Sequence, residues 1–349
     1  MVYEQKHRYS DFGRNYARFC KGLLSAFWKS PVLESTLSVR DCFDARKLIL
    51  TGSGIGYAAA RSLYSLFCSK SDIMFGVELM SQSDLNYFPD PRALGADEPN
   101  TPLVILLSES PYSFDYYASL NAVRSVAGNC ISICAQGDSR EKLISLGLDP
   151  DDPNYLVKSY VGMLFALIGI IFRIARVRGT VSELELSRTE QAITDYLNAC
   201  QGRLAAIDGS VLDFAKKCGG KHFFEYIADW DHAGCAQFLG VLGAHTLGLH
   251  YDVSDSEGWC HINVWEKYRE EICTVSIGDS HQSSFSRLLE TTSNVRILER
   301  PYLFVTDAPT DSLYCSFIPE APAEYPWLTA FADFLPVLSV MGLMGCQNS

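Results

Sequence analysis

The sequence predicts an α/β protein of two similar domains, each a three-layer αβα sandwich around a parallel sheet, with a helical arm at the N-terminus. Two observations carry this prediction. From residue 47 onward, short apolar runs alternate with segments of helical periodicity, a pattern typical of βαβ units with helices on both faces of a sheet. A second series of the same kind begins about 175 residues after the first, so the chain repeats its organisation at the scale of a domain.

Residues 1–40 form the predicted N-terminal arm. Apolar side chains recur there at intervals of three and four, as they do on one face of a helix. The positions are Phe12, Tyr16, Phe19, Leu23, Leu24 and Phe27. We expect this helix to pack on the rest of the protein.

The first α/β domain is predicted over residues 41–180. Its short apolar runs are expected to be strands, and the segments between them are expected to be helices. The expected strands lie in KLILTG, IMFGVEL, TPLVILLS and NCISICA, and the expected helices are Gly56–Ser69, Ser113–Ala127 and a long apolar helix from Val157.

Amphipathic helices over residues 181–218 are expected to link this domain to a second one over residues 219–349. The second domain repeats the alternation of strands and helices. Its expected strands lie in HFFEYIAD, LHYDVSD, EICTVSIGD, NVRILER and YLFVTD, and its expected helices are His232–Leu247, Ser283–Thr292 and a C-terminal helix from Trp327.

Composition and charge exclude several classes of protein. A chain of 349 residues with 48% hydrophobic and 20% charged residues has ordinary globular composition. A formal charge of −12 with scattered Lys and Arg argues against nucleic acid as a partner, because phosphate contacts need clustered basic residues. The twelve cysteines include no C-x-x-C pair, which indicates reduced thiols and a cytoplasmic setting.

Two apolar segments, Val161–Phe172 and Phe334–Gly345, are the candidates for membrane spans. Each uninterrupted run is shorter than the roughly 20 residues that a bilayer requires. We expect both to be buried core helices and expect no membrane partner. The first residues also have no apolar segment typical of a secretory signal.

A glycine-rich turn follows the first expected strand. Gly54, Gly56 and Ala59 satisfy the pattern G-x-G-x-x-A, and Glu78 follows about 20 residues later, where a dinucleotide-binding protein places a ribose-binding acid. A nicotinamide-dependent enzyme is therefore one hypothesis. Close packing of a helix on a strand can produce the same pattern without any ligand.

A turn rich in serine follows the third expected strand. Ser108, Ser110 and Ser113 gather at the start of a helix, where hydroxyls and free N–H groups can hold a phosphate with little help from Lys or Arg. A dinucleotide enzyme does not need such a cluster there. The alternative is that Ser113 is an N-cap and that the other serines form the turn.

The segments TGSG, SESPYS and VKSY, followed by a second α/β domain, resemble the tandem sugar isomerase (SIS) domain family. The family includes the isomerase half of glucosamine-6-phosphate synthase and the fructosamine-6-phosphate deglycases, and the C-terminal YPWLTAFADFLPVL is similar to the deglycases. The resemblance implies two flavodoxin-like domains. It also implies that a sugar phosphate is held by the glycine turn and the serine turn, with a lysine beside the sugar. The residues so implied are Gly52, Ser53, Gly54, Ser108, Ser110, Ser113 and Lys158.

The sequence departs from the family pattern at several of these positions. Pro111 and Tyr112 replace the usual glycine and acidic residue of the serine turn, which removes one N–H donor, and Val157 replaces a threonine. Ala244 stands where the synthase has a catalytic glutamate, and this replacement weakens the hypothesis that the protein catalyses simple isomerisation. The chain opens Met1-Val2 with no room for a glutaminase domain, so glutamine-dependent synthesis is not expected.

The catalytic candidates are Glu257 and His261, which lie in DVSDSEGWCHINVW. Aldose–ketose conversion needs a carboxylate that moves a proton between C1 and C2 and an imidazole near the ring oxygen. The segment lies where the family has E-x-x-H-G-P, but the spacing is four residues, which places both side chains on one face only if the segment is helical. The alternative is a solvated acid and a structural histidine.

A metal site at Asp252, Asp255, Glu257 and His261 is poorly spaced, and we expect no metal and no cofactor. In the second domain, Asp231 would repel a phosphate in ADWDHAG, so only the first domain is expected to bind one. Asp231 and His232 lie where a strand meets a helix, a place favoured for ligand contacts, and the alternative is that Asp231 is simply the N-cap of the helix. The function so predicted is a phosphosugar isomerase or deglycase. It would act as a homodimer or higher homo-oligomer, and an active site shared across a dimer interface is common in the family. The alternative is a non-catalytic phosphosugar sensor.

Overall fold

The computed structural model describes residues 2–73, 76–88, 90–92, 94, 102–125, 129–139, 142–265, 269–308 and 315–347. The chain divides into two compact units. One is Cys20–Gln191, and the other combines Met1–Phe19 with Ala192–Ser349. Two long helices, α1 (Val2–Phe27) and α9 (Glu183–Cys218), each contribute residues to both units. The division predicted at residues 40, 180 and 218 stays a prediction.

The unit Cys20–Gln191 contains a parallel sheet of five strands in the order β2-β1-β3-β4-β5. The central strands β1 and β3 are runs of apolar residues, and every residue of β3 is buried. Strands covered on both faces read as continuous apolar runs, as these two do. The strands are β1 (Lys47–Gly52), β2 (Val77–Ser81), β3 (Pro102–Ser108), β4 (Asn129–Cys134) and β5 (Leu143–Ser145).

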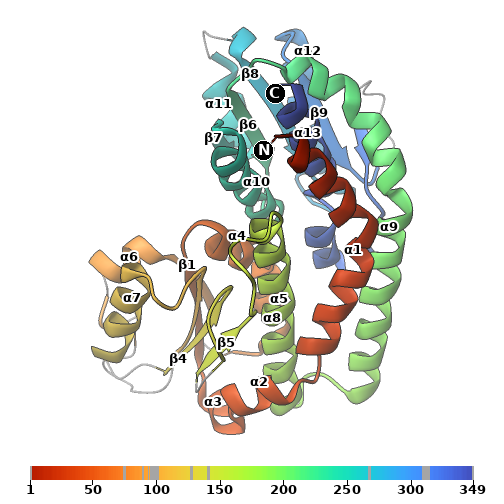
Figure 1. The fold of residues 1–349 in the computed structure, drawn as a ribbon. Coiled ribbons are helices and arrows are strands. Elements are labelled where there is room, and N and C mark those ends of the chain that lie inside the picture. The colour runs from red at the N-terminus through yellow and green to blue at the C-terminus, as the bar shows by residue number, and fades with distance from the viewer. Residues whose placement is uncertain are drawn as a thin grey trace. The chain divides into compact units, whose positions relative to one another are not determined.

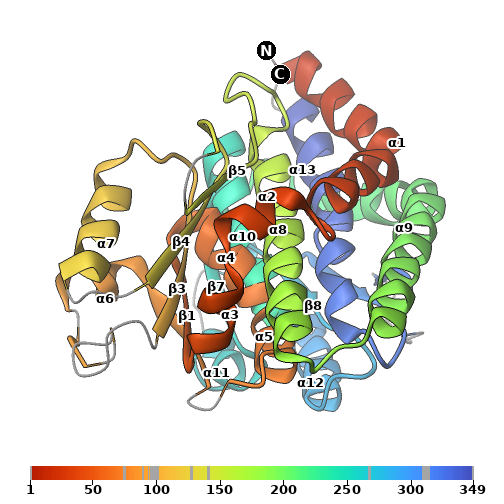
Figure 2. The same cartoon turned by 90° about the horizontal axis from the view of Figure 1, so that it is seen from below.

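Helices cover both faces of this sheet. Figures 1 and 2 show α6 and α7 on one face and α4, α5 and α8 on the other. The helices are α2 (Pro31–Thr36), α3 (Val39–Asp44), α4 (Gly54–Ser62), α5 (Tyr64–Lys70), α6 (Gln82–Tyr87), α7 (Phe114–Ser125) and α8 (Tyr155–Arg178). The single helix predicted over Gly56–Ser69 is instead two helices, because Leu63 (φ −121°, ψ 14°) leaves helical geometry between them.

The other unit contains a second parallel sheet, in the order β10-β9-β8-β6-β7. Read outward from β6, this is the order that the first sheet has outward from β1. The fold class predicted from the sequence, two parallel sheets each flanked by helices, is therefore confirmed. The strands are β6 (Phe223–Ala228), β7 (His250–Ser254), β8 (Ile272–Ile277), β9 (Tyr302–Thr306) and β10 (Cys315–Phe317).

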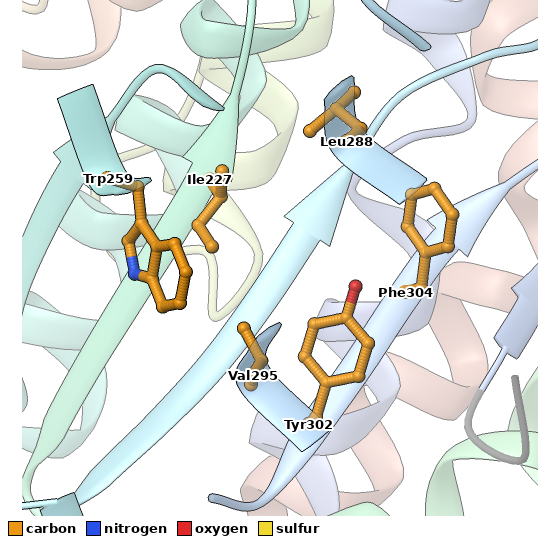
Figure 3. Close-up of a cluster of buried hydrophobic side chains, with 6 residues drawn as sticks. All are labelled: Ile227, Trp259, Leu288, Val295, Tyr302 and Phe304. Carbon is orange, nitrogen blue, oxygen red and sulfur yellow. The ribbon is translucent and has the colours of Figure 1, made fainter. Parts of the chain in front are cut away.

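The helices of this sheet pack in two groups, since α10 contacts α13 and α11 contacts α12. One side of the sheet carries a cluster in which Trp259 of α11 meets Ile227 of β6 and residues of α12 and β9 (Figure 3). The helices are α10 (His232–Leu247), α11 (Ser256–His261), α12 (Phe285–Ile297) and α13 (Leu335–Gln347), with 3₁₀ turns η1 (Asn263–Trp265), η2 (Arg269–Glu271) and η3 (Pro326–Phe331).

The prediction of a strand in NVRILER is wrong. Helix α12 continues to Ile297, and the next strand begins only at Tyr302. The buried residues of this helix are Leu288, Thr291, Thr292 and Val295, which recur at helical spacing. Val295 thus belongs to the buried face of the helix. The burial of this face outweighs the β-propensity of the short apolar run.

Two helical segments, Tyr155–Arg178 and Pro326–Gly345, are long and apolar enough to cross a membrane by length and composition. In both, 83% of the most apolar stretch is buried inside the protein. Helix α8 is longer than its apolar run because polar residues extend it at both ends. Its burial agrees with the prediction of a core helix.

The turn from β1 to α4 lies directly against strand β3. A Cβ atom on Gly52 would stand 2.7 Å from the carbonyl oxygen of Leu107, and one on Gly56 would stand 2.8 Å from the same oxygen. Real Cβ atoms do not approach a backbone oxygen so closely. Packing against β3 therefore requires glycine at both positions, whether or not a ligand binds.

We predict that Gly56→Ala lowers the free energy of unfolding by about 1–3 kcal/mol, because the added methyl group forces the backbone of α4 or β3 to shift. Gly22→Ala is the control. Gly22 is an exposed helical glycine with open space around the position of a Cβ, so alanine there should stabilise by up to about 1 kcal/mol. Chemical denaturation measures both changes, and a Gly56→Ala protein as stable as wild type would contradict the close approach.

Candidate functional site

The first candidate site lies at the carboxyl ends of strands β1 and β3. Gly52 and Leu107 are register partners, so the residues that follow them emerge side by side at one edge of the sheet. The chain leaves β1 toward β2 on one side, and β3 lies on the other side of β1. This is the point where the strand order reverses, and open α/β sheets bind ligands in the crevice there.

The glycine turn presents backbone donors at this edge. Ser53 occupies the N-cap position of α4 with extended backbone, and its side chain makes no capping hydrogen bond. The first N–H groups of a helix have no acceptor one turn back. Those of Gly54 and Ile55 can therefore serve a ligand, whereas the N–H of Gly56 donates to the carbonyl of Ser53 at 3.0 Å. Gly54 has a φ of +50°, a conformation that favours glycine.

Glu78 lies in the wrong place for a dinucleotide. It is the second residue of β2, near the amino end of the strand, and it forms an ion pair with Lys47 at the start of β1. A ribose-binding acid belongs at the carboxyl end of that strand. The glycines at 52 and 56 are in turn explained by packing against Leu107. Neither the glycine pattern nor Glu78 therefore supports the hypothesis of a nicotinamide-dependent enzyme.

The three serines of the β3–α7 turn converge on one another. The hydroxyls of Ser108 and Ser113 donate to the carbonyl of Ser110, at 3.0 and 3.4 Å. The Oγ of Ser110 accepts from the N–H of Tyr112 at 3.2 Å, and the Oγ of Ser113 accepts from the N–H of Tyr116 at 3.1 Å. Ser113 thus caps α7, as the alternative interpretation expected. The 3.4 Å bond is long, so its proton is the one most easily redirected to a ligand.

Strand β4 and helix α8 fix the position of the serine turn. The N–H groups of Ala135 and Gln136 donate to the carbonyls of Ser108 and Glu109, at 3.2 and 3.1 Å. The hydroxyl of Tyr155, in the first turn of α8, donates to the carbonyl of Glu109 at 3.4 Å. The first turn of α8 therefore lies beside the serine turn, a neighbourhood that sequence spacing alone did not predict.

Lys158 lies one turn further along α8 and forms an ion pair with Asp152. Both side chains are about one-quarter exposed. Asp152 also accepts from the N–H of Asn154 at 2.8 Å, which fixes the carboxylate just before the helix. A sugar contact by Lys158 would have to compete with this carboxylate.

Glu257 and His261 lie on helix α11 in the other unit. Their side chains meet at 2.9 Å (Glu257 Oε1 to His261 Nε2), and each is about two-thirds exposed. Trp259, between them in sequence, is fully buried in the cluster of Figure 3 and anchors the opposite face of the helix. The two catalytic candidates therefore share the solvent face, as their four-residue spacing predicted for a helix.

The guanidinium of Arg287 also faces the Glu257 carboxylate. The Nε of Arg287, in α12, lies 2.9 Å from Glu257 Oε2. The hydrogen bond from His261 and the charge of Arg287 lower the pKa of Glu257. The carboxylate consequently stays ionised to lower pH than an ordinary glutamate.

Two polar anchors that the sequence did not reveal hold α11. The N–H and hydroxyl of Ser256 both donate to the carboxylate of Asp229 at 2.7 Å. Beyond the helix, the amide of Asn263 donates at 3.0 Å to both Glu225 and Asp252. The signal that could have revealed Glu225 is its position as an acid inside an otherwise apolar strand.

The carboxylates proposed as alternative metal ligands have other roles. Asp255 is the N-cap of α11 and accepts from the N–H of Gly258 at 2.6 Å. Asp252 accepts from Ser254 at 2.8 Å and from Asn263. These bonds account for both side chains without a cation.

We predict that Ser113→Ala lowers the free energy of unfolding by about 1 kcal/mol, because α7 loses its N-cap. Ser113→Asp should restore most of this loss, because aspartate caps equally well. The control is Ser125→Ala, at the exposed C-terminal end of α7, which should change stability by less than about 0.5 kcal/mol. Equal stability of Ser113→Ala and wild type in chemical denaturation would show that the cap contributes nothing.

No protein-family model matches the chain, and no curated protein matches it in sequence. Solved structures do match. A proposed phosphosugar isomerase from Clostridium difficile superposes with a TM-score of 0.77 at 13% identity, over 98% of this chain and 93% of that one. The C-terminal domain of glucosamine-fructose-6-phosphate aminotransferase from Francisella tularensis gives 0.69 at 12% identity, over 99% and 93%.

Tagatose-6-phosphate ketose/aldose isomerase from Escherichia coli gives a TM-score of 0.65 at 15% identity, over 98% of this chain and 90% of that one. All three matches span nearly the whole of both chains. At these identities they establish the fold and leave the activity to be argued from the residues. The chain therefore has the two-domain fold of the sugar isomerase (SIS) proteins that the serine turn and the domain repeat resembled.

Proposed function

We propose that this protein is an enzyme that binds a hexose 6-phosphate, or an amino-sugar or fructosamine 6-phosphate, and moves a proton between C1 and C2. It would act as an isomerase or deglycase. The observation that carries the proposal is the convergence of the glycine turn, the serine turn and the start of α8 at the point where the first sheet reverses its strand order. The sugar-phosphate enzymes among the structural neighbours support the same substrate class.

In this proposal the phosphate is held mainly by neutral donors. The N–H groups at the start of α4 and the hydroxyls of Ser108, Ser110 and Ser113 supply hydrogen bonds, and the positive end of the α4 dipole supplies charge complementarity. A chain with a formal charge of −12 needs such a local arrangement to attract an anion. Lys158 would contact the sugar after exchanging its bond to Asp152.

Glu257 and His261 are proposed to carry the chemistry. The ionised carboxylate of Glu257 would take the proton from C2 of the opened sugar and return it to C1, while the proton of the C2 hydroxyl passes to the C1 oxygen, so that the same carboxylate acts first as base and then as acid. His261 would donate a proton to the ring oxygen on opening and take one back on closure. Arg287 keeps the glutamate ionised before the first step, and it favours return of the proton in the second.

We also propose a homodimer or higher homo-oligomer in the cytoplasm, without cofactor or metal. No disulfide joins the eleven cysteines whose side chains the structure describes, which is consistent with a reducing compartment.

The first test of the proposal is ligand binding. A thermal-shift screen of hexose and amino-sugar 6-phosphates should raise the Tm by about 5–10 °C at a concentration about 100-fold above Kd. Ser108→Ala should reduce this shift, and Ser113→Asp should abolish it, because the aspartate keeps the cap but repels the phosphate. Ser69→Ala, in α5 of the same unit, is the control and should shift like wild type. A full shift in Ser113→Asp would place the phosphate elsewhere.

The second test is turnover. Glu257→Gln and His261→Ala should each lower kcat about 100-fold or more while the thermal shift by the sugar phosphate persists. Glu290→Gln is the control, because this carboxylate also pairs with Arg287 at 2.7 Å but has no proposed chemistry. Full turnover in both catalytic variants would refute the assignment. Tight binding with no turnover by wild type would identify a sensor instead of an enzyme.

A further inference from the structure

A buried histidine at the carboxyl edge of the second sheet lies between two buried carboxylates. His232, the first residue of α10, contacts Asp279 through Nε2 at 2.8 Å and Asp333 through Nδ1 at 2.7 Å. The three residues are only 5%, 5% and 1% exposed. Asp279 follows strand β8, and Asp333 lies between η3 and α13. One imidazole thus joins three separate parts of the unit.

This arrangement does not suit catalysis by His232. A general base needs a ring nitrogen with a free lone pair, and both nitrogens here contact carboxylate oxygens. An imidazole between two carboxylates is best satisfied as an imidazolium that donates from both nitrogens. The contacts indicate a structural role.

Asp333 is the one charged residue of the C-terminal segment 326–347. We call residues 326–347 the C-terminal segment. It accepts a hydrogen bond from the hydroxyl of Tyr16 at the carbonyl of Phe331, and it also packs through apolar contacts. Phe334 meets Phe238 of α10 edge to face at 5.8 Å, and it meets Tyr16 of α1 at 6.0 Å. Apolar surfaces are tolerant of sliding, whereas a buried charged contact specifies one register.

Other titratable groups surround the three residues. Asp307 and Tyr196 lie near Asp333, the thiol of Cys235 on α10 also faces it, and His281 lies near Asp279. Burial lowers the pKa of His232, but the charges and hydrogen bonds of Asp333 and Asp279 raise it well above its ordinary value. Burial raises the pKa of Asp279, yet its bond to His232 leaves that pKa lowered.

We propose that Asp279, His232 and Asp333 form a proton-dependent latch that fixes the C-terminal segment against α10 and the β8 loop. The latch is closed while the imidazole carries two protons. Loss of one proton leaves two buried carboxylates facing a neutral ring, and the segment is released. The proposal is independent of the proposed sugar-phosphate site.

The pH range of release follows from linkage. The proton is bound more tightly in the closed state, so closure is fully favoured below the pKa of a free histidine, about 6.5. Above that pH the closed state loses about a factor of ten in its equilibrium constant per pH unit, until the raised pKa of His232 is passed. The latch is therefore closed at neutral and mildly acidic pH and opens under alkaline conditions.

Hydrogen exchange of the full chain, followed by mass spectrometry of peptides within residues 326–347, tests the latch. In wild type, protection corrected for the intrinsic pH dependence of exchange should fall about tenfold per pH unit above about pH 6.5. In His232→Gln, the same peptides should be less protected at pH 6.5 and show no such slope. His245→Gln, an exposed histidine of the same helix, should follow wild type.

Asp333→Asn provides the second variant, which remains informative if His232→Gln folds poorly. The asparagine keeps the shape and a hydrogen bond but removes one carboxylate, so the slope in protection should end at a lower pH than in wild type. A wild-type segment whose corrected protection stays flat from pH 6.5 to alkaline pH would overturn the proposal. A slope unchanged in both His232→Gln and Asp333→Asn would overturn it as well.

Discussion

The close approach of the β1–α4 turn to the carbonyl of Leu107 is the constraint on which the first site depends. It requires glycine at positions 52 and 56, and it sets helix α4 directly above the carboxyl end of β3. Only with the helix in this place do its first N–H groups lie at the same edge as the serine turn. Backbone bonds from β4 and the hydroxyl of Tyr155 then hold that turn in place.

The two sheets share a strand order but differ in the chemistry at their reversal points. The first carries serine hydroxyls and the start of helix α4, and the second carries a histidine already satisfied by two carboxylates. An anion at the second point would face Asp279 in place of neutral donors. In the function that we propose, the two edges have different roles, because the first binds a ligand and the second contributes to the stability of its unit.

Periodicity and turn chemistry predicted the fold, because alternating apolar runs of this length are satisfied by few architectures. They wrongly predicted a strand in NVRILER, where Val295 lies on the buried face of a helix. They also predicted one helix across Leu63, where no sequence signal marks the break between two helices. At the site, the serines, the glycines and the Glu257–His261 pair could be found from spacing. The bonds of Lys158 to Asp152 and of His232 to Asp333 could not, because they depend on tertiary neighbours.

The unit that contains the second sheet is discontinuous, since it takes its first 19 residues from one end of the chain and the rest from the other. The hydroxyl of Tyr16 donates to the carbonyl of Phe331, 315 residues later. On a ribosome that adds about 5–20 residues per second, Phe331 is synthesised roughly 15–60 seconds after Tyr16. During synthesis, residues 20–191 are complete while Phe12 and Tyr16, which are buried in the finished protein, still lack the C-terminal part of their unit, so these two rings stay exposed until the chain is nearly finished.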